Sequence, residues 1–346
     1  MHSTVGDTPA HYRKLGLDPQ TIAPWEDGLR TDPAACSFEW WYFDCHLDDG
    51  AKLAIEFHTK PPYVSPRAPL TPYVSFVLDR PDGTRVQRAA TLDPAAFTAA
   101  RERCDVRIGD NTFAGDLQRY AIHLAIDDVV ADITLVGEVQ SWRPASGHVL
   151  FGADESQYVA WLPSVPRGRV TAALAIGGER VVLGGVGYHD HNWGNAPLRT
   201  LVDHWYWGRA RVGDYTVLTL MFTSHEAYGR RTVPALMLAK GAELLASGDA
   251  SNVRFAALDP GVIAESGVPV ANRVRYEVDA GPDRYRVTFG RRKDVFGLDF
   301  GKAGAYQRFL GDVTLERADS GGWADVARDD AMWELLYFGP RVSAGA

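Results

Sequence analysis

The sequence lacks the local motifs of the common cofactor-dependent and metal-dependent enzymes. It has no G-x-G-x-x-G dinucleotide motif, no G-x-x-x-x-G-K-[ST] phosphate loop and no G-x-S-x-G nucleophile elbow. It also has no C-x-x-C or H-E-x-x-H pair, and the spacing of its three cysteines, Cys36, Cys45 and Cys104, is not that of a zinc site. We therefore expect neither a cofactor nor a resident metal ion.

Long apolar runs and an excess of basic charge are also missing. No apolar segment opens Met1–Tyr12, and no later run approaches the ~18 residues of a membrane-spanning helix. The formal net charge of −8 argues against a phosphate-backbone partner. We expect a reduced, soluble, cytoplasmic protein that binds neither nucleic acid nor membrane. The sequence leaves its oligomeric state open.

The chain is instead rich in aromatic residues and short strand patterns. Ten Trp, 14 Tyr and 14 Phe occur among its 346 residues, many of them in clusters. Phe38–Asp44 and Lys52–Thr59 flank an Asp-Gly turn and predict a hairpin. In the second of these strands Leu53, Ile55 and Phe57 share one face, while Ala54, Glu56 and His58 share the other.

Similar strand patterns recur at intervals of about 8–12 residues along most of the chain, which predicts antiparallel β-barrels or sandwiches. One segment, Ala89–Arg103, favours a helix, because Asp93 can cap its first turn and Pro94 suits the first helical position. The fold class we expect is all-β with a few short helices.

An internal repeat predicts the domain organisation. Trp40-Trp41-Tyr42 and Trp205-Tyr206-Trp207 lie 165 positions apart, and the same offset without a gap pairs Leu53 with Leu218, Ile55 with Leu220 and Phe57 with Phe222. A period of this length indicates a domain duplication rather than a solenoid. We expect a Pro-punctuated arm over residues 1–33, a first domain over 34–198 and a second over 199–346.

Gly184–Asn195 is the most informative stretch for function. Polar side chains follow the apolar run Val181–Leu183 there, and such groups are costly to bury without a partner or a task. On a strand, Tyr188, Asp190 and Asn192 share one face, and His189, His191 and Trp193 share the other. Asp190 is either a general acid oriented by Tyr188 or a bracing residue that binds backbone groups.

The remaining candidates also have two interpretations each. His189 and His191 could bind one metal ion, but further ligands have no obvious source, so hydrogen-bonded structural histidines are favoured. Trp161 could stabilise a cation through its ring face or could be a core residue. Glu39 shares a face with Trp41 and is expected to be buried and hydrogen-bonded, with structural roles for most of Phe38–Asp44.

Two motifs carry a family resemblance. The sequences EWWYFD at Glu39–Asp44 and GVGYHDHNWG at Gly185–Gly194 resemble the carotenoid 1,2-hydratase (hydroxyneurosporene synthase) superfamily, and the lipocalin-like Diels–Alderases of polyketide pathways more closely still. The resemblance spans most of residues 34–340. It implies two lipocalin-like (calycin) β domains with a substrate pocket between them. In the hydratase branch it also implies that Asp190 protonates an alkene, with Tyr188 and, less directly, Trp161 beside it.

From these motifs we expect a cofactor-independent cyclase or pericyclase that acts on a polyene, polyketide or terpenoid intermediate of specialised metabolism. An alkene hydratase with Asp190 as the acid is the alternative, and a non-catalytic carrier of an apolar ligand is the third hypothesis. The catalytic residues expected are Asp190 and Tyr188. The expected substrate contacts are Trp161, Glu39, Trp41, His189, Asn192 and Trp205.

Overall fold

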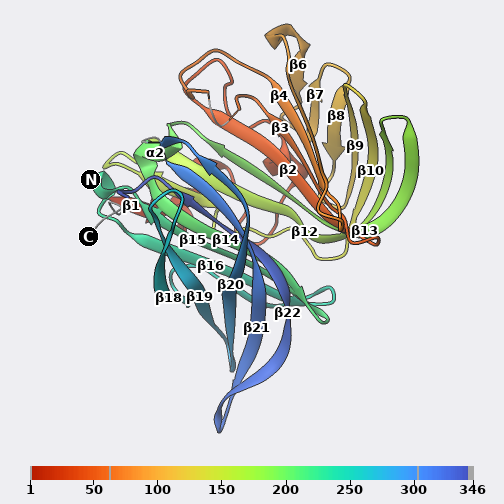
Figure 1. Ribbon diagram of the computed structural model, residues 1–346. Coiled ribbons are helices and arrows are strands. Elements are labelled where there is room, and N and C mark those ends of the chain that lie inside the picture. Colours follow the sequence, from red (N-terminus) through yellow and green to blue (C-terminus); the bar gives the residue numbers. More distant parts are fainter. Residues whose placement is uncertain (1, 62–63, 302–303, 342–346) are drawn as a thin grey trace. The chain divides into compact units, whose positions relative to one another are not determined.

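The computed structural model describes residues 2–61, 64–301 and 304–341, and these are mostly β-strand (Figure 1). The chain folds into two compact units, each with an apolar core of its own. The unit called N-terminal here comprises Gly6–Val149 and Gln157–Pro197. The C-terminal unit comprises Leu198–Ala346 together with Met1–Val5 and Leu150–Ser156.

The N-terminal unit contains one long antiparallel sheet with the strand order β5-β4-β3-β2-β13-β12-β10-β9-β8-β7-β6. The sheet curls around a core of apolar side chains and forms a half-barrel (Figure 1). Its strands are β2 (Phe38–Leu47), β3 (Lys52–His58), β4 (Tyr73–Asp79), β5 (Arg85–Thr91), β6 (Phe97–Ala99), β7 (Asp105–Ile108), β8 (Asn111–Gly115), β9 (Arg119–Ile126), β10 (Val129–Gly137), β12 (Gln157–Ile176) and β13 (Glu179–Gly194).

The C-terminal unit contains a second antiparallel sheet, with the order β17-β16-β15-β14-β22-β21-β20-β19-β18 around its own apolar core. Its strands are β14 (Val202–Val212), β15 (Tyr215–Ser224), β16 (Thr232–Lys240), β17 (Glu243–Gly248), β18 (Val253–Ile263), β19 (Val268–Ala280), β20 (Asp283–Asp299), β21 (Ala305–Asp319) and β22 (Gly322–Tyr337). The expected all-β fold class is confirmed.

Helices are short. Among the described residues, α1 (Pro9–Leu15) and α2 (Leu198–Leu201) are α-helical, and η1 (Pro24–Asp27), η2 (Pro94–Ala96) and η3 (Glu226–Tyr228) are 3₁₀ turns. Two further short strands are β1 (Ser3–Val5) and β11 (His148–Phe151). Within the part of the chain described, no helix combines the length and apolar character needed to cross a bilayer.

The helix expected over Ala89–Arg103 is wrong. Asp93 does cap a turn, accepting a hydrogen bond from the Ala95 N–H, and Pro94 follows it, but the turn is only the 3₁₀ segment η2. Strand β6 follows immediately and pairs with β7. The capping signals were therefore local, and strand pairing determines the conformation of the rest of the segment.

The strand order of the two sheets supports the duplication. In the N-terminal sheet, β2 lies between its hairpin partner β3 and the strand β13. In the C-terminal sheet, β14 lies in the same way between its hairpin partner β15 and the last strand, β22. The offset of 165 positions, however, does not hold beyond the hairpin turn, because the turn between β14 and β15 is one residue shorter than the turn between β2 and β3. Trp41 pairs with Phe57, whereas Tyr206, which is equivalent to Trp41, pairs with Met221. The inward positions on β15 are thus Val217, Thr219 and Met221, not Leu218, Leu220 and Phe222.

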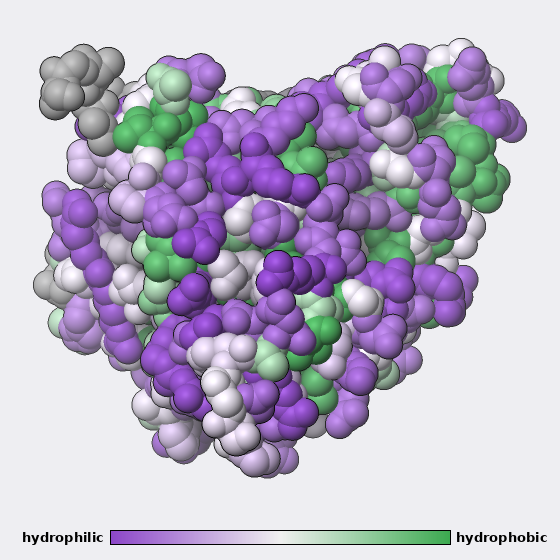
Figure 2. All heavy atoms as spheres, turned by 60° about the horizontal axis from the view of Figure 1, so that its bottom comes forward, coloured by the Kyte–Doolittle hydropathy of each residue, from purple (hydrophilic) through white to green (hydrophobic). Residues whose placement is uncertain are grey.

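The molecular surface seen in Figure 2 is predominantly hydrophilic, and its hydrophobic residues form separate small areas. The larger apolar side chains that are exposed among the described residues are Val130, Val181, Val182, Val262, Val295, Leu298 and Val326.

Candidate active site

Strand β13 lies in the middle of the N-terminal sheet, between β2 and β12. Its glycines allow this close pairing. A Cβ atom on Gly185 would lie 2.5 Å from the carbonyl oxygen of His46 on β2, and one on Gly187 would lie 3.1 Å from the carbonyl oxygen of Asp44. The glycines of β13 thus allow it to pair closely with β2. The polar residues that follow them are in register with β2, and Asp190 pairs with Tyr42.

Asp190 is the centre of a buried hydrogen-bond cluster on the outer face of this sheet. Its Oδ2 atom accepts the Tyr188 hydroxyl at 2.7 Å and the Trp161 indole N–H at 2.8 Å. Its Oδ1 atom accepts the Asn192 side-chain amide at 2.8 Å. These four residues come from the neighbouring strands β12 and β13, and we call them the Asp190 cluster.

The environment of Asp190 is that of an acid rather than a permanent anion. The residue is 5% exposed, and burial raises its pKa to about 7, although the hydrogen bonds from Tyr188 and Trp161 act in the opposite direction. Oδ2 is occupied by two donors, whereas Oδ1 accepts one. Oδ1 is therefore the oxygen with room for a proton. A carboxylic acid with a pKa near 7 can donate a proton at neutral pH.

A second polar pair lies next to the Asp190 cluster on β2. The Tyr42 hydroxyl donates to Asp44 Oδ2 at 2.8 Å, and the Tyr42 and Tyr188 rings lie 6.3 Å apart. Tyr42 is opposite Asp190, and Asp44 is opposite Tyr188. Aromatic rings thus surround the acid on this face, which limits the water that competes with an apolar substrate.

The inner face of the same strand carries a different network. His189 Nε2 lies 3.1 Å from Asp27 Oδ2, and the Tyr120 hydroxyl donates to the same oxygen at 2.6 Å. His189 Nδ1 lies 2.8 Å from the carbonyl oxygen of Tyr42, which can only accept. Burial opposes the ionisation of Asp27, but His189, His191 and Tyr120 outweigh burial and lower its pKa. His189 and Asp27 are therefore best described as a buried ion pair.

Glu39 and His191 extend this inner network. His191 Nε2 lies 2.8 Å from Glu39 Oε1, and its ring stacks on Trp41 with centroids 4.6 Å apart. The second oxygen of Glu39 accepts the Thr31 backbone N–H at 2.8 Å and the Thr31 hydroxyl at 2.6 Å. Glu39, Trp41 and His191 are each 0% exposed. The network attaches the N-terminal segment to the sheet.

Three residues of the inner network, Asp27, Cys104 and His189, have ligand atoms within 4.8 Å of one another. They fit a metal ion poorly. Both ring nitrogens of His189 already face oxygen acceptors. Burial, together with the charge of Asp27, raises the pKa of the Cys104 thiol well above its usual range, whereas metal binding requires the thiolate. The cluster is better explained by its hydrogen bonds.

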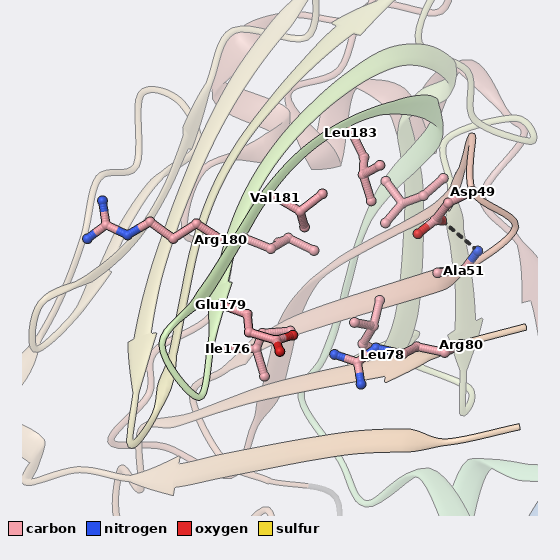
Figure 3. A pocket seen from close by; sticks show the side chains of 11 residues that line it. Asp49, Ala51, Leu78, Arg80, Ile176, Glu179, Arg180, Val181 and Leu183 are labelled. Atoms are coloured by element: carbon pink, nitrogen blue, oxygen red, sulfur yellow. Dashed lines mark hydrogen bonds between the residues drawn. The ribbon is translucent and has the colours of Figure 1, made fainter. Parts of the chain in front are cut away.

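A pocket of about 120 Å³ lies elsewhere in the N-terminal unit, at the end of the sheet where the β2–β3 and β12–β13 hairpins turn (Figure 3). Leu47, Leu78 and Leu183 contribute apolar surface, and Arg80 and Glu179 contribute charge. Leu183 precedes Asp190 by seven positions on the same strand, which corresponds to at most about 23 Å. The pocket contains none of the residues expected in the active site.

The structure divides the site residues expected from the sequence into groups. Asp190, Tyr188, Trp161 and Asn192 come together on the outer face through direct hydrogen bonds. A second group, Glu39, Trp41 and His189, lies in the inner network on the opposite face. Trp205 lies on β14 in the C-terminal unit. Substrate contact by these residues stays a prediction.

Asp27 and Tyr120 belong to the inner network but were not expected there from the sequence. Asp27 is 1% exposed, although the segment containing it was expected to be an arm laid over the domain. Pro24 begins its 3₁₀ turn and Gly28 follows it, so a short capped turn was recognisable. Nothing local indicated that its acid enters the core. The Glu56–His58 pair on β3 was placed on one face but given no role.

The fold and the site define a class of antiparallel β-sheet protein in which a protonatable acid is held among aromatic residues. Comparison with known proteins identifies the family. Residues 32–254 match the Diels-Alderase-like family, so the chain belongs to that family. The resemblance expected from the two motifs is confirmed.

Two relatives and one solved structure are similar to the chain. The chain is 25% identical over 284 residues to the quinolone epoxide rearrangement protein AsqO of Emericella nidulans, covering 78% of this chain and 77% of the relative. It is 30% identical over 203 residues to hydroxyneurosporene dehydrogenase of Chlorobaculum tepidum, covering 50% of this chain and 53% of that protein. The crystal structure of CghA with Sch210972 shares the fold, with a TM-score of 0.65, 15% identity and 89% coverage of both chains.

Proposed function

We propose that the protein catalyses an intramolecular cyclisation or rearrangement of a small polyene, polyketide or terpenoid metabolite, with Asp190 as the proton or hydrogen-bond donor. The observation that carries the proposal is the position of Asp190, buried among Tyr188, Trp161 and Tyr42 with a pKa of about 7. Family membership and the relative that acts in quinolone epoxide rearrangement support the same class of reaction.

The chemistry follows from the two effects that this site can supply. A carboxylic acid that donates to a carbonyl, epoxide or alkene makes the attached carbon more electrophilic. The surrounding aromatic side chains can hold an apolar chain in a reactive conformation, and restricting a flexible substrate to such geometries lowers the barrier by several kcal/mol. A Trp ring next to the acid also stabilises cationic charge, by about 0.5–2 kcal/mol.

Hydration of an alkene is the second candidate, because the same acid could generate a carbocation that water traps. The resemblance of Tyr188-His189-Asp190 to the Tyr-x-Asp pattern of the hydratase branch favours keeping it. The two reactions differ in their atom balance. An isomerisation leaves the mass of the substrate unchanged, whereas hydration adds one molecule of water.

The test is to incubate the protein in heavy-oxygen water with a linear polyene and with a quinolone epoxide, and to analyse the products by mass spectrometry. We expect an isomer without label from the wild type and at least ~100-fold less from Asp190→Asn. A labelled product would identify a hydratase. Tight stoichiometric binding without any product would identify a carrier, and equal turnover by Asp190→Asn would contradict the role of the acid.

A further inference from the structure

A second acid–base pair lies on the same face of the sheet as Asp190. Glu56 and His58 point outward from β3, because Ile55 and Phe57 point into the core. Glu56 is paired across the strands with Tyr42, and Tyr42 is paired with Asp190. Adjacent strands lie about 4.8 Å apart, so Glu56 is about 10 Å from Asp190 along this row. Strands β13, β2 and β3 thus form a continuous platform.

The geometry of His58 is that of an oriented base. Its Nε2 atom lies 3.0 Å from Glu56 Oε2, which also accepts the Ser75 hydroxyl at 3.3 Å. The ring stacks on Trp40 with centroids 5.8 Å apart and meets Tyr73 edge-on at 5.6 Å. A neutral imidazole that donates from Nε2 to a carboxylate leaves the Nδ1 lone pair as an acceptor. Within the described ranges, Nδ1 has no hydrogen-bond partner of its own.

The groups that face His58 come from its own strand, β3, and from both neighbouring strands, β2 and β4. Glu56 lies on the same strand, Tyr73 and Ser75 lie on β4, and Trp40 lies on β2. Asn192 of the Asp190 cluster is the cross-strand partner of Trp40. Glu56 is the acid that directly contacts His58, whose side chain is 6% exposed. The side chain of Glu56 is 34% exposed, so the Glu56–His58 dyad joins a buried histidine to a partly exposed carboxylate.

We propose that the Glu56–His58 dyad is a second proton-transfer site, which removes a proton from the nucleophile of the substrate while Asp190 protonates the leaving oxygen. The proposal rests on the proposed function and adds the substrate class: a small metabolite that carries both an O–H or N–H nucleophile and an epoxide-like C–O bond. Glu56 is then a positioning residue and His58 a catalytic residue.

The step balances without any co-reactant. The nucleophile transfers its proton to His58 Nδ1, and its electron pair forms the new bond to carbon. The C–O bond breaks, and the released oxygen takes the proton of Asp190. The product is an isomer of the substrate. Proton exchange with water then returns Asp190 to its acid form and His58 to its neutral form.

The separation of the two groups suits this arrangement. The substrate must form one hydrogen bond to the acid and one to the base. Between these bonds lie the distance from the nucleophile to the attacked carbon, about 3 Å, and the breaking C–O bond, with the three reacting atoms nearly in line. These spans together require about 10 Å. His58 is two strands across and two residues along the sheet from Asp190, about 12 Å between Cα atoms, so the two side chains and a substrate of this size can span the gap.

His123 provides a matched control. It lies 2.7 Å from Asp132 on the neighbouring strand β10, but its side chain is 39% exposed and that of Asp132 is 65% exposed. It also lies outside the platform, on β9. His123→Gln thus removes a histidine–carboxylate pair from the same sheet without changing the surroundings of Asp190.

The experiment measures turnover of a quinolone epoxide that carries a free hydroxyl group by wild type, His58→Gln, Glu56→Gln, Asp190→Asn and His123→Gln. We expect His58→Gln to lower kcat by about 10²–10³-fold with little change in KM. Added imidazole should restore activity to His58→Gly. Nitrogen-15 NMR of the histidines should show the Nε2–H tautomer of His58, and Glu56→Gln should abolish that preference.

The possible failures are distinguishable. Full kcat in His58→Gln, together with loss in Asp190→Asn, overturns the dyad and leaves the proposed function intact. Absence of an isomer from the wild type overturns both. An Nδ1–H tautomer of His58 overturns the dyad whatever the kinetics, because Nδ1 would then have no lone pair to offer. Unfolding temperatures of all variants separate a loss of folding from a loss of chemistry.

Discussion

The Nδ1 atom of His189 lies 2.8 Å from the carbonyl oxygen of Tyr42. Tyr42 is the cross-strand partner of Asp190, which follows His189 in the sequence and points to the opposite face of the sheet. The buried inner network therefore holds the backbone at the position that presents the acid. This relationship explains why polar residues alternate on both faces of β13: one face braces the strand, and the other carries the candidate chemistry.

The pH dependence of activity should follow the protonation of Asp190. Its pKa is raised to about 7, so the acid form predominates below this value and is lost as the pH rises through it. We expect kcat to fall by about tenfold per pH unit well above pH 7. A pH–rate profile with a solvent-isotope comparison measures this, and a flat profile between about pH 6 and 9 would contradict proton donation by Asp190.

Removing either donor to Asp190 Oδ2 should raise the pKa of Asp190 further. Trp161→Phe and Tyr188→Phe each delete one hydrogen bond to the charged form, worth about 1.5–3 kcal/mol, which corresponds to about one to two pKa units. The limb of the pH–rate profile at high pH should shift upward in both variants. Trp142→Phe is the control, because Trp142 meets the Trp161 ring edge-on at 5.7 Å but gives Asp190 no hydrogen bond. A downward shift in either variant would refute the assignment.

The raised pKa of Asp190 also predicts its effect on stability. Because the folded-state pKa of about 7 exceeds the ordinary value of 3.8, folding favours the protonated acid. This contribution is fully present below about pH 4 and is lost as the pH rises through 7, by on the order of 4 kcal/mol. Asp190→Asn cannot ionise, so its stability relative to the wild type should increase from pH 5 to pH 8. Urea unfolding at both pH values measures the change, and a constant difference would contradict burial as the cause.

The sequence could predict the faces of β13 because a strand alternates with period two, whatever surrounds it. Tyr188, Asp190 and Asn192 were therefore assigned to one face correctly, and Trp161 joined them through the motif resemblance. The pattern could not reveal Asp27, because its position depends on a 3₁₀ turn and on contacts with residues more than 90 positions away. Glu56 was assigned to the face of its strand opposite Ile55 and Phe57, but its relation to Asp190 depends on the order of β3, β2 and β13.

Loss of the charge on Asp27 should destabilise the N-terminal unit. Asp27→Asn leaves the His189 and Tyr120 donors without an anion in a fully buried site, and breaking such a pair costs about 3–5 kcal/mol. Since the folded-state pKa of Asp27 is lowered, its contribution is present above its ordinary pKa of 3.8 and is lost as the pH falls. Denaturant unfolding near pH 7 measures the loss. The exposed Asp110→Asn is the control, and an equal effect in both variants would show that the pair is not stabilising.

Neighbouring glycines on β13 offer a test of how closely the strand must approach β2. In Gly185→Ala the new methyl group would lie 2.5 Å from the carbonyl oxygen of His46, so the backbone must separate. In Gly184→Ala the nearest atom, also at 2.5 Å, belongs to the carboxylate of Asp48, a short flexible side chain that can rotate away. We expect Gly185→Ala to cost about 1–3 kcal/mol, as overpacking does, and to lower activity because Asp190 shifts with the strand. Gly184→Ala should stay within about 0.5 kcal/mol of the wild type. Thermal unfolding and turnover of both variants measure these effects, and equal losses would mean that backbone contact with β2 does not position the acid.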